Sequence, residues 1–267
     1  MEEIKKDVLI LGAGASGSYL SVQLRDRGYS TITLEKSNRA GGHSQTYRDA
    51  LTGNFGDVGV RIYPNRPVIR QFYKRFGIKL TKADLTLAKR VYINGKTGEK
   101  DPYGDPNPLR VWYALYRYEK IFKRHYPFLA EPGYQLPESI PEELFLPFSQ
   151  FLKKYNLGKG YMPITHYLQG FGAVKDIPAI YALKNMNPAI TKSARYNSFV
   201  WPENGCDEIY QKITALLGND LKLNTEIHSI RRKDTHIEVE AKSGESPLLI
   251  KCHKLIVSYP PMLNKMD

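Results

Sequence analysis

The feature that most constrains this chain is a run of ten residues, 8–17, near its amino terminus. Its first four residues, Val-Leu-Ile-Leu, are apolar and are typical of a buried parallel strand. They lead directly into a GxGxxG turn, and residues compatible with a helix follow from Ser18 to Arg27. A second strand, Thr31–Leu34, ends on Glu35. This order of strand, glycine turn, helix, strand and acid predicts a dinucleotide-binding βαβ unit.

The residues of the glycine turn each have a physical reason. Gly12 permits the tight turn, Gly14 leaves room for a pyrophosphate near the backbone, and Gly17 lets the helix pack closely against the strand. The helix N-terminus, at Ala15 and Ser16, presents free N–H groups and the positive end of the helix dipole to phosphates. We therefore predict a cofactor contact at each of these residues. The alternative is a glycine-rich turn without a ligand.

Glu35 is the acid that a dinucleotide site needs. It lies 18 residues after Gly17, where a carboxylate accepts a hydrogen bond from a ribose hydroxyl. A negative charge here also repels a 2′-phosphate, so we expect NADP to bind poorly. The alternative is an exposed acid at a strand end, paired with Lys36 or Arg39.

Length and composition limit the class of protein. The 267 residues allow one large domain or two moderate ones, and 42% hydrophobic residues suffice for an ordinary core. Two cysteines, Cys206 and Cys252, predict no disulfide framework and suit a reducing compartment. The amino terminus has no apolar signal region, and no stretch reaches the ~20 apolar residues of a membrane span. We therefore expect a cytoplasmic protein without a membrane partner.

The net charge of +12 is spread along the chain and predicts a basic surface that favours an anionic cofactor or substrate. Nucleic-acid binding would require a dense basic patch or a recognised motif, and the sequence contains neither. The six histidines show no metal-ligand spacing, so we expect no metal. The expected partner is a small-molecule substrate, and the oligomeric state stays open.

Strand and helix patterns fall at both ends of the chain. A helix is predicted at Pro67–Phe76 and a hairpin at 90–103, where Asn-Gly forms the turn. Residues 54–60 contain two glycines and predict a turn. A second helix is predicted at Cys206–Leu217. Short strands are predicted after it, at Leu221–Leu223, Glu226–Arg231, His236–Ala241, Leu248–Cys252 and Leu255–Ser258.

The middle of the chain has a different character. It is rich in proline and tyrosine, with helical patterns at Pro108–Tyr126, Pro141–Tyr155 and Ile164–Gln169. We predict an α/β fold: a Rossmann-like domain of residues 1–103 and 188–267, with a mostly helical insertion at 104–187 and a late β-meander. Ligands of such sheets bind beyond the carboxyl ends of the strands, so the insertion is expected to cap that edge.

Four motifs stand in a recognisable order: Gly12–Gly17, Glu35, Arg39–His43 and Asp57–Val60. In this order they resemble the flavin-containing amine oxidase superfamily, and within it the fungal FAD-dependent oxidoreductases. The same likeness includes three later segments, Trp201–Gly205, Asn224–Ile227 and Leu255–Pro261. It implies a Rossmann-like FAD-binding domain.

The resemblance implies a role for each motif. The three glycines of the first turn would hold the FAD pyrophosphate, and Glu35 would bind the adenosine ribose. Arg39 and Gly42 would lie along the pyrophosphate and ribityl chain. Gly59 and Val60 would pass near the isoalloxazine. Ile227 would offer backbone groups to the adenine.

His43, in the second glycine loop, is a further candidate in the cofactor site. It is either a catalytic base or flavin attachment point, or a loop histidine with local hydrogen bonds. No catalytic residue is assigned.

The function implied is oxidation of a C–N or C–C bond of a small organic substrate by hydride transfer to flavin. The family's C-terminal Gly-Asp segment and final helix are not in this sequence. We therefore expect a C-terminally truncated chain that binds FAD weakly. Two alternatives stay open: a non-catalytic FAD-binding relative and an NAD-dependent dehydrogenase.

Overall fold

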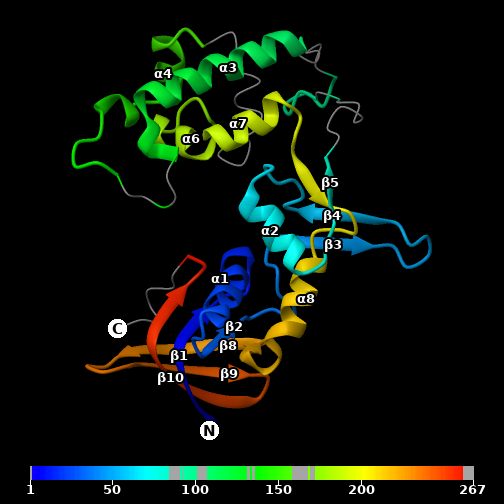
Figure 1. Ribbon diagram of the computed structural model, residues 1–267, viewed down its shortest axis with the longest axis vertical. Coiled ribbons are helices and arrows are strands. Elements are labelled where there is room, and N and C mark those ends of the chain that lie inside the picture. Colours follow the sequence, from blue (N-terminus) through cyan, green and yellow to red (C-terminus); the bar gives the residue numbers. More distant parts are fainter. Residues whose placement is uncertain are drawn as a thin grey trace. The chain divides into compact units, whose positions relative to one another are not determined.

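The computed structural model describes residues 2–83, 91, 93–100, 107–130, 133, 136–157, 168 and 172–260. The chain divides into two compact units, drawn in Figure 1. The sheet unit comprises Met1–Arg61, Gln71–Leu80 and Trp201–Asp267, and the helical unit comprises Ile62–Arg70 and Thr81–Val200. The helical unit thus includes more residues than the predicted insertion at 104–187. The role of that insertion as a cap stays a prediction.

The sheet unit is built on a six-stranded sheet of order β7-β2-β1-β10-β9-β8 (Figure 1). Strands β7, β2, β1 and β10 are parallel, whereas β9 and β8 follow as antiparallel neighbours. This confirms the Rossmann-like α/β fold with a late β-meander. The strands are β1 (Glu2–Leu11), β2 (Thr31–Leu34), β7 (Leu221–Lys222), β8 (Thr225–Arg232), β9 (Ile237–Ser243) and β10 (Ser246–Val257).

Strand β1 contains the apolar run that precedes the glycine turn. Leu9, Ile10 and Leu11 are fully buried, because parallel sheets are covered on both faces. Helix α1 (Ala15–Asp26) follows the glycine turn as predicted. The strand is longer than the apolar run, since Glu2–Lys6 also pairs with β10. In this first part of the strand Glu2, Glu3 and Lys5 are exposed, so their charges stay in water while the backbone pairs.

Strand β10 corrects one prediction. The sequence predicted two strands, Leu248–Cys252 and Leu255–Ser258, but the structure has one strand, Ser246–Val257. Residues of β10 pair with β1 both before and after the polar pair His253-Lys254. This pairing keeps the backbone extended through the polar pair. The two ends of β10 differ in their neighbours: Leu248–Cys252 pairs with both β1 and β9, whereas the last apolar residues, Leu255–Val257, pair with β1.

The segment 54–60 was predicted as a turn, and this was wrong. Its residues form β4 (Phe55–Gly59), which pairs with β3 (Ser44–Arg48) in an antiparallel hairpin. Glycine lowers strand propensity, but the register with β3 supplies the hydrogen bonds. Helices α2 (Pro67–Arg75) and α8 (Glu208–Leu217) confirm two predicted helices within two residues of their bounds.

The helical unit confirms the mostly helical character of the middle of the chain. Asn107 and Asn187 cap α3 and α7 with their side chains, and each is followed by proline at the first helical position. The elements are α3 (Pro108–His125), η1 (Pro127–Ala130), η2 (Glu142–Leu144), α4 (Phe148–Lys154), α6 (Ala179–Asn185) and α7 (Pro188–Arg195). Strands β5 (Leu80–Lys82) and β6 (Val200–Pro202) form a two-stranded sheet.

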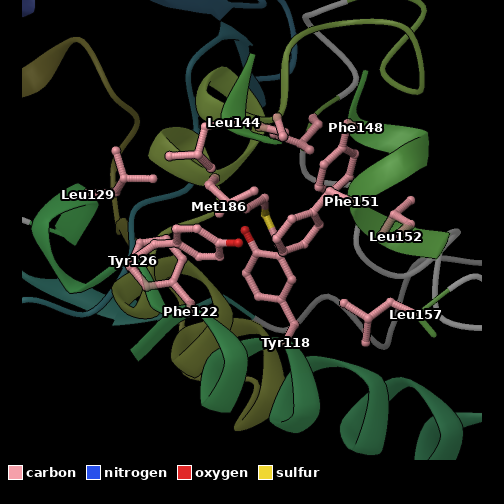
Figure 2. Packing of buried hydrophobic residues seen from close by; sticks show 14 of the residues in the cluster. Tyr118, Phe122, Tyr126, Leu129, Leu144, Phe148, Phe151, Leu152, Leu157 and Met186 are labelled. Carbon is pink, nitrogen blue, oxygen red and sulfur yellow. The ribbon is translucent and has the colours of Figure 1, made fainter. Parts of the chain in front are cut away.

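The predicted helix Pro141–Tyr155 is split into η2 and α4. Pro147 lies between them and cannot donate a backbone hydrogen bond, so a continuous helix cannot form. Figure 2 shows that α3 and α4 share one aromatic core, in which the ring of Tyr118 from α3 meets Phe151 of α4 edge-on and Phe148 stacks on Phe151. The helical unit therefore has a hydrophobic core of its own.

Two predictions lie partly outside the described residues. Of the helix at 164–169, only Leu168 is described, and it is buried. Of the hairpin at 90–103, residues 93–100 are described, with Ile93 bridged to Lys100 as expected for a turn at Asn-Gly. In the described part of the chain, we found no helix long and apolar enough to cross a membrane.

Candidate dinucleotide-binding site

The turn between β1 and α1 requires glycine at two of its three glycine positions. Gly12 has a φ of +95°, and a Cβ there would lie 2.7 Å from Ser258 Oγ. A Cβ on Gly17 would lie 1.9 Å from the carbonyl oxygen of Gly12. The clash at Gly17 is with the backbone of the turn itself, whereas Gly12 is required by its positive φ and by its close contact with Ser258.

Gly14 differs from its neighbours. It precedes α1 with a φ of −68°, which any residue adopts, and no heavy atom lies within 4 Å of an added Cβ. Ala15 and Ser16 are exposed, and no side chain among the described residues caps the helix. The first-turn N–H groups of α1 therefore face an open space, which fits a phosphate group.

Glu35 binds the glycine turn directly. Its Oε2 accepts a hydrogen bond from Ala13 N–H at 2.8 Å, and its Oε1 accepts one from Ser37 N–H at 2.9 Å. Each carboxylate oxygen can accept a second hydrogen bond. No ion pair of the described residues includes Glu35, and Arg39 makes its contacts elsewhere. Ribose binding by Glu35 stays a prediction.

Arg39 fastens the second glycine loop. Its guanidinium donates to the Gly42 carbonyl at 2.8 Å and, at longer range, to the Ala40 and Ser44 carbonyls and Gln45 Oε1. This arginine therefore shapes the loop from within. Its contact with a pyrophosphate stays a prediction.

The second glycine loop lies against the first turn. Gly41 N–H donates to the Ala13 carbonyl at 2.8 Å, and a Cβ on Gly42 would lie 3.1 Å from Gly14 Cα. Gly41 and Gly42 have φ values of +108° and +54°, so both adopt a conformation that favours glycine. The two loops thus line one space with backbone atoms.

A third glycine segment joins the second. Gly59 has a φ of +99°, and a Cβ there would lie 2.1 Å from the His43 carbonyl oxygen. Val60 N–H donates to the same oxygen at 3.3 Å. The side chains of His43 and Val60 are exposed. The backbone of His43 is therefore structural, and among the described residues no hydrogen bond or ion pair is found for its imidazole.

Asp57 explains why this segment is held in place. Its Oδ1 accepts hydrogen bonds from Thr46 Oγ1 at 2.6 Å and from Cys206 N–H at 2.8 Å. The carboxylate thus ties the β3–β4 hairpin to the residues that precede α8. The sequence pattern gave Asp57 as part of a motif, but not this structural role.

Ile227 lies on β8, an edge strand of the sheet, yet the chain brings this strand close to Glu35. Thr225 N–H donates to the Glu35 carbonyl and Asn224 N–H to the Ser37 carbonyl, both at 2.9 Å. Ile227 is two residues further along, half-buried against the sheet core, at a register shift of β8 against β9. The structure therefore brings it toward the acid. Its contact with an adenine stays a prediction.

Sequence reasoning missed two residues at the end of β10. Ser258 donates through N–H and Oγ to the Leu11 carbonyl, each at 2.9 Å. The ring of Tyr259 lies 3.1 Å from a Cβ built on Gly12, and burial, together with the negative charge of Glu35, raises the pKa of this phenol. A parallel register between the first and last apolar strands would have predicted this contact.

The site thus combines backbone N–H donors, an open space next to Gly14 and the carboxylate of Glu35. These are the features that a ribose and a diphosphate require. All of them lie at the carboxyl ends of β1 and β2, where α/β sheets bind ligands (Figure 1).

Comparison with known proteins agrees with this geometry. Residues 10–76 match the family model for an NAD(P)-binding Rossmann-like domain. The chain is 30% identical over 269 residues to the β-cyclopiazonate dehydrogenase of Aspergillus oryzae, covering 99% of this chain and 57% of that protein. It is also 30% identical over 273 residues to an FAD-dependent oxidoreductase of Emericella nidulans, covering 98% and 56%.

This chain is similar in sequence to fungal FAD-dependent oxidoreductases. It spans little more than half the length of these relatives, 57% of the first and 56% of the second. Two solved structures share the fold of this chain. The fatty acid isomerase of P. acnes has a TM-score of 0.79 at 21% identity, covering 98% of this chain and 61% of the isomerase. Putrescine oxidase bound to putrescine has a TM-score of 0.74 at 20% identity, covering 99% and 60%.

Proposed function

We propose that this chain binds FAD through its sheet unit, as part of an oxidoreductase that transfers a hydride from a C–N or C–C bond of a small organic substrate to the flavin. The observation that carries the proposal is the meeting of three glycine segments with Glu35. Residues 12–17, 41–42 and 59–60 are joined by backbone contacts at one edge of the sheet. The similarity to FAD-dependent oxidoreductases over almost the whole chain supports the same conclusion.

In this proposal the N–H groups at the start of α1 bind the pyrophosphate, beside Gly14 and Gly42. Glu35 accepts hydrogen bonds from the adenosine ribose through its remaining lone pairs. The backbone near Ile227 faces the adenine, and Gly59 with Val60 passes near the isoalloxazine. The open space at Gly14 supports this fit, since a Cβ there would enter the volume that the ligand needs.

FAD, when bound, supplies the hydride acceptor. The residues of this chain bind it and orient it. The binding groups are largely backbone, so the chain contributes positioning.

A second candidate ligand is a nicotinamide dinucleotide. The match of residues 10–76 to an NAD(P)-binding Rossmann-like domain favours it. The second glycine loop favours FAD instead, because it packs on the phosphate turn through Gly41 and Gly42. A simple nicotinamide site needs only the first turn and the acid.

Calorimetric titration of the 267-residue chain with FAD, NAD, NADP and ADP tests the proposal. We expect saturable binding of FAD, weaker binding of ADP, and the weakest binding of NADP, because Glu35 repels a 2′-phosphate. Tighter binding of NAD than of FAD would favour the nicotinamide candidate. Absence of saturable binding for all four ligands would contradict dinucleotide binding altogether.

A further inference from the structure

The strand order places the end of β10 at a particular point of the sheet. From β1 the chain continues to β2 on one side, whereas β10 lies on the other side of β1. Ligands of such sheets bind at the point where the strand order reverses, outside the carboxyl ends of the strands. Here that point lies between Gly12, which follows β1, and Ser258, which follows β10. Nothing in the dinucleotide motif assigns Ser258 a role.

Ser258 fills the inside of the glycine turn. Its Oγ lies 2.9 Å from the Leu11 carbonyl oxygen and 3.0 Å from that of Gly12, so its one proton is shared between two acceptors. A Cβ on Gly12 would come within 2.7 Å of this oxygen, and a Cβ on Gly17 within 2.8 Å. The hydroxyl therefore occupies the notch that the two glycines leave.

One peptide unit joins Ser258 to Glu35. The peptide between Gly12 and Ala13 is planar, with its carbonyl and its N–H pointing in opposite directions. Its carbonyl oxygen receives the Ser258 hydroxyl, and its N–H donates to Glu35 Oε2 at 2.8 Å. Ser258 and Glu35 thus hold the same peptide from its two ends. A rotation of this peptide would move the carboxylate and the N–H groups that follow it together.

We propose that Ser258 is a positioning residue of the dinucleotide site, which acts through the Gly12–Ala13 peptide on Glu35 and on the phosphate turn. The ligand it serves is a ribose with a diphosphate, as in ADP and in the ADP half of FAD. The inference rests on the proposed function. It adds that the last strand of the sheet, 246 residues away from the turn, sets the orientation of the binding groups.

The test measures ADP affinity by calorimetry in the whole chain. Ser258→Ala removes the hydroxyl, and Ser258→Thr retains it. Ser30→Ala is the matched control, because Ser30 Oγ also makes a hydrogen bond in the sheet unit, to Asp7 at 2.6 Å, but before β2 rather than after it. Thermal unfolding of each variant reports its stability separately from its binding.

We expect Ser258→Ala to weaken ADP binding by about five- to tenfold, which is the loss of about one hydrogen bond. Ser258→Thr is expected to stay within about twofold of the original affinity, and Ser30→Ala to leave it unchanged. The effects of Ser258→Ala and Glu35→Gln are expected to be less than additive in ADP affinity, because both act on one peptide.

Three results would overturn the inference. The first is unchanged ADP affinity in Ser258→Ala, and the second is an equal loss in Ser30→Ala, which would indicate a general loss of stability. The third is full additivity with Glu35→Gln. Failure of the original chain to bind ADP would instead contradict the proposed function, and this inference with it.

Discussion

Gly14 is the residue at which the account makes its sharpest claim, because its backbone conformation does not require glycine. Gly14→Val is expected to weaken FAD binding by about a hundredfold, about 2.8 kcal/mol, since the branched side chain enters the ligand's space. The fold should lose less than about 1.5 kcal/mol, as expected for a helix N-cap change. Calorimetry and thermal unfolding measure the two effects.

Gly56→Val provides the matched control for this prediction. Gly56 lies in β4, also without a positive φ, and no heavy atom lies within 4 Å of an added Cβ. FAD affinity should not change in this variant. An equal loss of binding in both variants, or no loss in Gly14→Val, would contradict the placement of the ligand.

The negative charge of Glu35 leads to a prediction about the preference between NAD and NADP. The chain is expected to bind NAD more tightly than NADP, and Glu35→Gln should reduce this preference because the repulsion of the 2′-phosphate is removed. Comparison of the two titrations in both proteins measures it. A preference for NADP in the original chain would show that Glu35 does not face the ribose.

At the scale of elements, α3 and α7 are held together by a buried ion pair. Glu119 Oε2 lies 3.3 Å from Arg195 Nη2, and their side chains are 5% and 9% exposed. Arg195 also packs over the rings of Trp112 and Tyr116. Glu119→Ala leaves the guanidinium buried without its partner and should destabilise the helical unit by about 3–5 kcal/mol in urea unfolding.

A variant at Lys123 tests whether the loss of stability depends on burial of the ion pair or only on a positive charge near Glu119. The Nζ of Lys123 lies 4.0 Å from the same carboxylate, but its side chain is largely exposed. Lys123→Ala should therefore change the free energy of unfolding by less than about 1 kcal/mol. Comparable losses in Lys123→Ala and Glu119→Ala would contradict the assignment of the buried pair as the principal contact.

Glu143 connects η2 to α4 and makes the helical unit sensitive to acid. Burial opposes its ionisation, but hydrogen bonds from Lys154 and Tyr126 outweigh it, so its pKa lies below the usual 4.5. A lowered pKa stabilises the fold fully above 4.5, and this contribution is lost as the pH falls through the lowered value. Glu143→Gln should therefore lower Tm at pH 7 and weaken its decline below about pH 4.5.

The neighbouring Glu142→Gln is the control for this titration. Glu142 is exposed, so its replacement should leave both Tm and its pH dependence nearly unchanged. Circular dichroism melts over a pH series measure both variants. An identical acid decline in Glu143→Gln and the original chain would assign the acid sensitivity to other groups.

Elements that depend on neighbouring residues were predicted better than elements that depend on contacts between distant parts of the chain. The first βαβ unit follows its sequence closely, because strand, glycine turn and helix are specified by neighbouring residues. The division of β10 into two strands was wrong, since its continuity depends on pairing with β1, more than 240 residues away. The split between η2 and α4 at Pro147 was missed although its cause is local.

For the whole molecule, the sequence predicted which residues gather at the site, but not what holds them there. Gly12, Gly14 and Glu35 could be predicted because the motif has a fixed spacing. Ser258 could not, since its role depends on the register of the last strand. Arg39 was expected to contact a ligand. Its hydrogen bonds to the surrounding loop could not be predicted, because they depend on the local fold of that loop and not on the spacing of residues in the motif.

Hydrogen exchange of the 267-residue chain, with and without FAD, tests the central claim most directly. The account predicts that FAD slows exchange at residues 12–17, 39–44 and 58–60 together, because the three glycine segments line one site. ADP should protect the first of these segments and leave residues 58–60 unchanged. Protection that leaves the first glycine turn unaffected, or that is confined to the helical unit, would contradict the account.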